Sequence, residues 1–346
     1  MITLEHQVPD RVPLDTWMSG GAIEVLCRHF NLPIETDPNG MWHDGILQRL
    51  RIDIRRPLPL YVGPPLKKYP DGSWETEIGV LRKGRGYGIA ITHPLREATQ
   101  IEQILDYTYP IPEWYDFSGL PDYCERNAQY TFTGGSKFPI FHEACDLMGM
   151  DRVMIKMIDD PKLIHTVLQK LTDAHMAITT RWLEASPNSI DIMIITDDFG
   201  GKQNTLISLK HWREFFKPHL KRVIDFGHSC GCKVMLHSDG AIRNIIPDLI
   251  EMGIDILNPI EPEANNMDPA GIKRDFGDQL ILHGAASSLN LAYATPEEIQ
   301  AEVKGLMEQV AQGGGYILCP SNHIMEDMPV ENILALYDTA YELGWY

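Results

Sequence analysis

Residues 190–198 read IDIMIITDD, a run of apolar residues that stops at two carboxylates, Asp197 and Asp198. Later runs have the same form: KVMLHSDG (233–240), IDILNPIEP (254–262), QLILHG (279–284) and GYILCPSNH (315–323). Short runs rich in Ile, Val and Leu, without polar alternation, are typical of strands buried on both faces of a parallel sheet. Stretches with helical spacing separate them, so the pattern predicts strands alternating with helices.

This alternation predicts an α/β fold, a (β/α)8 TIM barrel with an N-terminal extension of loops and a β-hairpin. We expect a single domain over 1–346, with the extension in 1–125, where Pro and Gly are dense, and most of the barrel in 126–346. SWETEIGVLRKGRGYGIAITHP (73–94) predicts the hairpin, which is expected over the barrel mouth. Because the carboxyl ends of barrel strands meet on one face, the polar residues that end the runs should share one pocket.

Composition excludes some classes of partner. A formal net charge of -18 argues against a nucleic acid or an anionic membrane as partner, since phosphate recognition relies on clustered Lys and Arg. The opening MITLEHQVPDRVPLD lacks the features of a signal peptide, and no apolar run reaches the ~18 residues of a membrane span. We therefore expect a cytoplasmic protein whose six cysteines are free thiols or metal ligands rather than disulfides.

His237, Asp239 and Cys319 are the candidate metal ligands. They end two of the runs and supply imidazole, carboxylate and thiolate, the groups that bind zinc in proteins. A catalytic zinc keeps three protein ligands and one open position, which this set would provide. The spacing equally suits side chains that are packed or hydrogen-bonded at strand ends, because no compact ligand motif is present.

Other candidate residues follow the same strands. Glu261 is a candidate fourth ligand or acid-base group, or else a solvated loop carboxylate. Adjacent strand residues point to opposite sides, so at most one of Asp197 and Asp198 faces the pocket; Asp197 is the candidate catalytic carboxylate, and the other is expected to cap the next segment. The residues expected to contact a substrate, with core packing as the alternative for the aromatic ones, are Gln203, His283, Trp17 and Phe199.

Longer stretches of the chain resemble the uroporphyrinogen decarboxylase superfamily. They are residues 196–262 (beginning TDDFGGKQ), 280–288 (LILHGAASS), 313–344 (beginning GGGYILCPSNH), 9–17 (PDRVPLDTW) and 86–98 (GYGIAITHPLREA). The resemblance spans nearly the whole chain and implies a (β/α)8 barrel.

Two branches of that superfamily compete. The decarboxylases carry an arginine-rich motif near the N-terminus, whose arginines hold the carboxylates of a tetrapyrrole, whereas this chain has RVPLDTW (11–17). Its acidic balance also suits a polyanionic substrate poorly. The cobalamin-dependent methyltransferases resemble this chain in having a histidine at the position of His237, and they bind zinc through a His-x-Cys pair and a later Cys.

The chain departs from that ligand pattern at two places. Asp239 stands where the first cysteine would be, and the later cysteine aligns near Asn322, while Cys319 precedes it; the sequence leaves open which of the two faces the site. Loss of soft ligands makes a zinc ion a stronger Lewis acid, which favours polarising an ether oxygen over activating a thiol. The same departures are equally compatible with a metal-free site.

The resemblance therefore implies a zinc-dependent methyltransferase. It would move a methyl group from a small methylated substrate, such as a methoxylated aromatic, to the cobalt of cobalamin on a separate corrinoid protein. The alternatives are a cofactor-free decarboxylase that works through a carboxylate such as Asp197, and a non-catalytic binding protein on the same fold. The sequence leaves open the identity of the methyl donor and whether the chain forms a homodimer.

Overall fold

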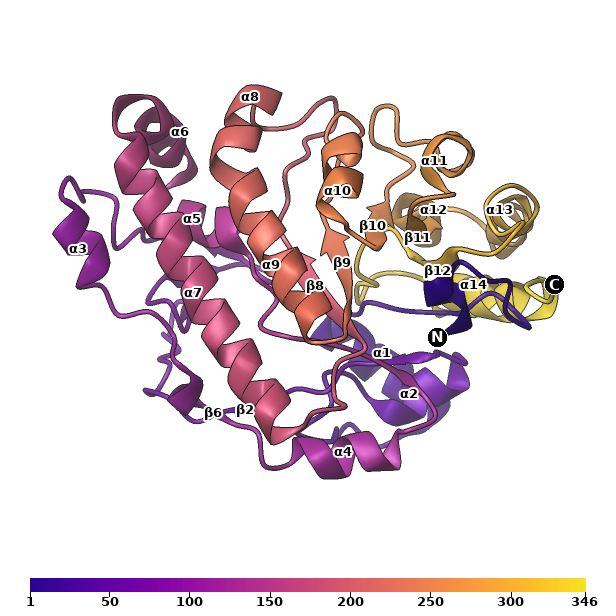
Figure 1. Ribbon diagram of the computed structural model, residues 1–346. Helices are drawn as coiled ribbons and strands as arrows, with labels where there is room; N and C mark the ends of the chain where they lie inside the picture. The colour runs from indigo at the N-terminus through magenta and orange to yellow at the C-terminus, as the bar shows by residue number, and fades with distance from the viewer.

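A computed structural model describes residues 1–346 as a curled parallel sheet surrounded by helices (Figure 1). The sheet has seven strands in the order β1, β7, β8, β9, β10, β11 and β12, and every adjacent pair is parallel. The strand bounds are β1 Ile54–Arg55, β7 Thr131–Gly134, β8 Ile192–Thr196, β9 Lys233–His237, β10 Ile256–Ile260, β11 Ile281–Ala286 and β12 Tyr316–Pro320. The five runs of the second half therefore form β8 to β12, as the sequence predicts.

An extended segment joins the two edges of this sheet. Leu14 pairs in parallel with Leu318 of β12, and Leu318 N–H donates to the carbonyl of Pro13 at 3.0 Å. On its other side, the carbonyl of Leu14 accepts from Asp53 N–H, just before β1, at 2.9 Å. The predicted eight-stranded barrel is thus confirmed in part. Seven regular strands form a curled sheet, and this segment spans the seam between the first strand, β1, and the last strand, β12.

Helices cover the outside of the sheet, and α7, α9, α10, α11 and α13 follow one another around it in Figure 1. Capping residues mark where several of these helices begin. Asp160 is the N-cap of α7, where its carboxylate accepts from Leu163 N–H, and Pro161 is the first residue of that helix. Thr295 and Glu298 form a capping box at the start of α13. The bounds are α5 Ile140–Met148, α6 Met150–Asp159, α7 Pro161–Ala185, α8 Leu209–His211, α9 Lys217–Ser229, α10 Ile246–Met252, α11 Pro269–Phe276, α12 Ser288–Tyr293, α13 Pro296–Gln309 and α14 Val330–Leu343.

The N-terminal region adds short elements over one end of the sheet. The expected hairpin in 73–94 is instead a three-stranded antiparallel sheet of β3, β4 and β5, with a second small sheet formed by β2 and β6. The bounds are α1 Gly20–Phe30, α2 Asp44–Arg49, β2 Leu60–Tyr61, β3 Trp74–Glu75, β4 Leu81–Lys83, β5 Ile89–Ala90, α3 Ile101–Leu105, β6 Tyr115–Asp116 and α4 Leu120–Arg126, with 3-10 turns at Ile2–Glu5 and Pro112–Trp114. This region is more than an extension, because β1 and the seam segment belong to the main sheet.

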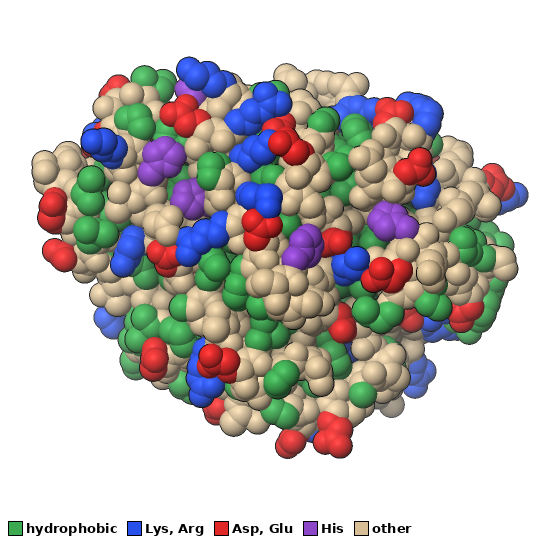
Figure 2. Space-filling view, in the orientation of Figure 1, with side chains coloured by type: hydrophobic (Ala, Val, Ile, Leu, Met, Phe, Trp, Pro, Cys, Tyr) green, Lys and Arg blue, Asp and Glu red, His purple; other side chains and the backbone are tan.

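The state of the cysteines and the charged side chains on the surface can be compared with what the composition predicts. All six cysteines are free. On the face shown in Figure 2, acidic and basic side chains are interspersed. No helix combines the length and the apolar character that a membrane-spanning segment needs.

Candidate functional site

A cavity of about 890 Å³ opens at the carboxyl ends of the first strands of the sheet. Gly134 of β7, Thr196 of β8 and His237 of β9 line it from the sheet. Trp74 of β3 and Tyr87, just before β5, line it from the small antiparallel sheet, which therefore lies over the mouth as expected. The volume falls within the ~300–1,000 Å³ that is typical of small-molecule sites.

Two buried polar groups on the cavity wall have no partner within the protein. The indole N–H of Trp17 and the hydroxyl of Thr133 are both buried without a hydrogen bond, and both residues line the cavity. Buried donors are nearly always satisfied in native proteins, since leaving one unpaired costs about 1–3 kcal/mol. These two groups are therefore available to donate hydrogen bonds to a polar molecule in the cavity.

His237 and two carboxylates form a compact cluster beside this cavity. Nε2 of His237 lies 3.7 Å from Oδ1 of Asp198 and 3.6 Å from Oδ1 of Asp239. Trp17 stacks on the imidazole, with ring centroids 4.7 Å apart and planes 15° from parallel. The backbone N–H of Asp239 donates to Asp198 at 3.0 Å, which holds the loops that follow β8 and β9 together.

The cluster has the donor set of a divalent cation site. One ligand atom from each of Asp198, His237 and Asp239 lies within 4.8 Å of the other two. Oδ1 of Asp239 is buried without any hydrogen-bond partner, while its other oxygen accepts from the amide of Asn322 at 3.0 Å. Burial raises the pKa of Asp239 to about 6, and the neighbouring carboxylates add to this. An orphaned carboxylate oxygen facing an imidazole nitrogen fits a bound metal ion, because the ion would satisfy both.

A buried chain of hydrogen bonds fixes which nitrogen of His237 faces the cluster. Nδ1 of His237 donates to the amide oxygen of Asn258 at 2.5 Å, and the amide nitrogen of Asn258 donates to Nδ1 of His283 at 2.6 Å. Nε2 of His283 then donates to Asp15 at 2.8 Å. The lone pair of Nε2 in His237 is therefore left free for a ligand, as in metal sites whose outer residues orient an imidazole.

Asp15 ends this chain as a stable anion. Arg56 binds it with two hydrogen bonds of 2.9 and 2.5 Å. Burial alone would raise the pKa of Asp15, but Arg56 and His283 outweigh that effect and hold it well below its usual value. Burial lowers the pKa of His283 in spite of Asp15, so its imidazole is neutral.

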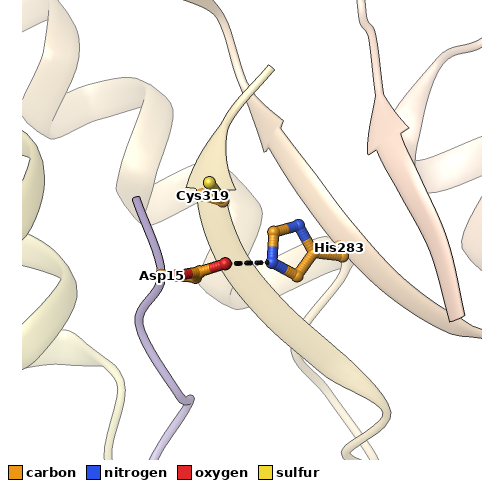
Figure 3. Close-up of side chains that lie close together, drawn as sticks. All are labelled: Asp15, His283 and Cys319. Atoms are coloured by element: carbon orange, nitrogen blue, oxygen red, sulfur yellow. Dashed lines mark hydrogen bonds and ion pairs between the residues drawn. The ribbon is translucent and has the colours of Figure 1, made fainter. Parts of the chain in front are cut away.

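Cys319 does not join the cluster of His237 and Asp239. Its side chain is buried in a second group with Asp15 and His283, seen in Figure 3, in which one ligand atom from each residue lies within 4.8 Å of the others. Burial raises the pKa of the Cys319 thiol well above its usual value, and Asp15 is already paired with Arg56. The expected ligand set of His237, Asp239 and Cys319 is thus divided between two groups. Cys319 lies inside β12, and Asn322, beyond that strand, contacts Asp239 instead.

The two adjacent carboxylates divide as strand geometry requires, but not as expected. Asp198 lines the cavity, whereas Asp197 is fully buried and does not. Asp197 accepts the backbone N–H groups of Phe141 and His142 at 2.8 and 2.9 Å, so it caps the start of α5, a preceding segment. The candidate catalytic carboxylate is therefore Asp198 rather than Asp197.

Of the residues expected to contact a substrate, Trp17 lines the cavity and the others do not. Phe199 is fully buried against aromatic rings including Phe141, and Gln203 is exposed in the loop after β8. His283 lies in the hydrogen-bond chain described above. Glu261 accepts from Gly240 N–H at 2.6 Å, so it supports the loop that carries Asp239 without lining the cavity.

Several cavity residues carry no signal that the sequence pattern could reveal. Lys137, Arg56 and Tyr87 line the cavity from a loop, a strand end and the small sheet, whereas His323, which also lines it, ends the apolar run 315–323 and so carries a signal. Asp15 and Asn258 do not line it and act through contacts with the two histidines. In the sequence, Asp15 is distinguished only by its place in PLDTW (13–17), and Asn258 only by its place after an apolar run.

The fold and the cluster at the strand ends define an α/β protein of the TIM-barrel-like class, with its site at the carboxyl edge of a parallel sheet. The chain belongs to the uroporphyrinogen decarboxylase (URO-D) family, which it matches over residues 86–343.

Known proteins of that family are distant relatives. Uroporphyrinogen decarboxylase from Psychromonas ingrahamii is 24% identical over 191 residues, 54% of this chain and 50% of that protein. The enzyme of the same name from Chlorobaculum tepidum is 23% identical over 265 residues, 74% of this chain and 72% of that protein. The chain thus spans about half the length of the first relative. A methyltransferase from Methanosarcina mazei has a similar structure, with a TM-score of 0.67, 21% identity and coverage of 99% and 96% of the two chains. That likeness shows a shared fold.

Proposed function

We propose that this protein is a metal-dependent methyltransferase, which moves a methyl group from a methoxylated aromatic compound to the cobalt of a separate corrinoid protein. The observation that carries the proposal is the Asp198, His237 and Asp239 cluster, whose orphaned carboxylate oxygen adjoins an aromatic-walled cavity. The structural likeness to a methyltransferase supports it.

Zinc is the metal that we propose, held by Asp198, His237 and Asp239. When bound, it would polarise the ether oxygen and so make the phenolate a better leaving group. Two carboxylates in place of thiolates suit this task, since they leave the ion a stronger Lewis acid. Cys319 takes no part in this proposed site, which therefore differs from the ligand set expected from the sequence.

The residues of the chain bind and orient the substrate. Trp17, Trp42, Trp74 and Tyr87 give the cavity aromatic walls on which a planar ring can stack. The unpaired indole N–H of Trp17 would donate a hydrogen bond to a substrate oxygen. The chain from Asp15 through His283 and Asn258 fixes the direction of the His237 ring, so that Nε2 faces the cluster.

Charge in the cavity favours a methyltransferase over a tetrapyrrole decarboxylase. The Lys and Arg side chains that line it are Arg56, Arg82 and Lys137, and both arginines are already paired with carboxylates, Asp15 and Asp146. A substrate with many carboxylates would need more free cations than one lysine, because each buried carboxylate needs a partner.

The test is a turnover assay with reduced corrinoid protein and a panel of methoxylated aromatics, methylamines and methylthiols. We expect demethylation of a methoxylated aromatic, near-stoichiometric zinc by elemental analysis, and loss of both in His237→Ala. Cys319→Ser should retain zinc and thereby separate the two groups of candidate ligands. Carbon dioxide release that survives exhaustive chelation would instead establish a decarboxylase, and ligand binding without turnover would establish a binding protein.

A further inference from the structure

Lys137 is a cation in the cavity without a partner. It follows β7 with a left-handed backbone (φ 64°), and its half-buried side chain makes no ion pair and no hydrogen bond. Its positive charge acts to lower the pKa values of Glu77 and His323, which line the same cavity. Burial lowers the pKa of Lys137, and the nearby Arg56 lowers it further.

The carboxylates that line the cavity have other hydrogen-bond partners, and none forms an ion pair with Lys137, although the charge of Glu77 acts on it. Glu77 accepts from the hydroxyl of Tyr115, and burial raises the pKa of Glu77. The other carboxylates on the wall also have polar partners: Glu75 with Tyr69, Glu143 with His175, Asp146 with Arg82, and Asp198 with the backbone of Asp239.

A second unsatisfied donor lies on the same strand end. The hydroxyl of Thr133, in β7, is buried without a hydrogen bond and belongs to a residue that lines the cavity. A carboxylate has two oxygens and accepts from an ammonium and from a hydroxyl at once. Removing an ammonium group from water without a partner costs free energy. An anionic ligand would supply that partner, so its binding would be favoured.

We propose that Lys137, with Thr133, binds the carboxylate of an aromatic acid, so that the substrates are methoxylated aromatic carboxylates rather than neutral aryl ethers. The substrate class rests on the proposed function, whereas the carboxylate subsite itself does not. In this proposal the aromatic walls hold the ring, Lys137 pairs with the acid group, and the methoxy oxygen faces the His237 cluster.

Binding measured without methyl transfer tests the subsite directly. Calorimetric titration would compare 3-methoxybenzoate with the neutral 3-methoxybenzyl alcohol, against the wild type, Lys137→Met, Lys137→Arg and the control Lys304→Met on the outer helix α13. We expect the wild type to prefer the acid, Lys137→Met to lose about 30-fold or more in affinity for the acid alone, and Lys137→Arg to retain part of the preference. Lys304→Met should behave as the wild type.

A folding check accompanies the titration. Lys137→Met should unfold at the same temperature as the wild type or a higher one, because it removes a half-buried charge that has no ion-pair partner. Equal binding of both ligands by the wild type, unchanged acid binding in Lys137→Met, or no binding of either ligand would each overturn the subsite. Acid-selective binding without methyl transfer would uphold the subsite and refute the proposed reaction, so the two failures are distinguishable.

Discussion

Asn258 connects the two buried histidines, and its role is visible only in three dimensions. Its amide accepts from His237 and donates to His283, so one side chain sets the tautomer of both rings. An isoleucine or leucine of similar size would satisfy the apolar pattern of β10 equally well. The sequence therefore predicts the strand but not the function of this residue within it.

Asn258→Leu should lower zinc affinity about 10- to 100-fold, because His237 loses the hydrogen bond that orients it. Competition with a chromophoric chelator would measure the change. Asn332→Leu is the matched control, since Asn332 is also a buried asparagine, and its amide donates to Leu291 and Ala294 away from the site. The control should lose stability and keep zinc affinity; unchanged zinc affinity in Asn258→Leu would show that the chain does not orient His237.

Asp239 makes the metal-free protein sensitive to pH. Burial raises its pKa from 3.8 to about 6, so between these values the folded state holds a proton that the unfolded chain has released. The stability contributed by this proton is complete below the unfolded pKa and is lost as pH rises through about 6.

Metal-free Asp239→Asn should therefore have a higher Tm than the wild type at about pH 7, and the difference should shrink as pH falls and vanish below the unfolded value of 3.8, where the carboxyl is neutral in both states. Thermal unfolding in a chelator across this range would test the prediction, with the exposed Asp327→Asn as control. A difference that does not vary with pH would contradict it. Added zinc should raise the Tm of the wild type more than that of the variant.

At the scale of elements, two glycines bring the loops after β8 and β9 into backbone contact. A Cβ on Gly240 would lie 2.6 Å from the carbonyl carbon of Gly200, and Gly240 has a φ of 86°. Ala241 N–H also donates to the carbonyl of Gly201 at 2.8 Å. This close approach sets the separation of Asp198 and Asp239, which precede these contacts on the two loops.

Gly240→Ala should separate the loops and abolish zinc binding. Gly231→Ala is a matched control, because Gly231 has a φ of 79° but open space around it. Both variants should lose about 1–2 kcal/mol through backbone strain, while only Gly240→Ala should lose metal. Chemical unfolding and metal analysis would separate the two effects, and zinc retained by Gly240→Ala would refute the role of this contact.

The sequence predicts elements better than it predicts contacts between them. Unbroken apolar runs identify β8 to β12, because a strand that is buried on both faces has apolar residues at successive positions. They do not say where each side chain points after its strand ends, and this explains the errors at the site. Cys319 stays within β12 and points into the buried group, while Asp197 reaches the start of α5. His237 and Asp239 do come together, since His237 ends β9 and Asp239 lies two residues further on.

At the scale of the whole molecule, the seam between β12 and β1 depends on Asp53. Its carboxylate binds Arg11 with two hydrogen bonds of 2.8 and 2.7 Å and accepts Leu14 N–H at 2.8 Å. The short β1 carries no long apolar run, and residues 13–15 look like a loop in sequence. The closing of the sheet was therefore predictable only from the resemblance, not from the pattern.

Asp53→Ala should destabilise the protein by about 1–3 kcal/mol, because Arg11 loses its carboxylate partner and Leu14 N–H loses its acceptor. Asp338→Ala is the control: Asp338 pairs with Arg51 at 2.6 Å on the surface, where an ion pair contributes at most about 1 kcal/mol. Urea unfolding would compare them. Equal losses in the two variants would show that the seam contributes no more than a surface contact.

The hydrogen bond from His283 to Asp15 joins residues 268 positions apart. A nascent polypeptide leaving the ribosome therefore holds the carboxylate long before the imidazole that it must meet has been translated. Until β11 and β12 emerge, Arg56 and Asp15 lack their final surroundings and His237 lacks its support. Chemical competence should thus arrive abruptly at the close of synthesis, and fragments ending before this point should be inert even when they are partly structured.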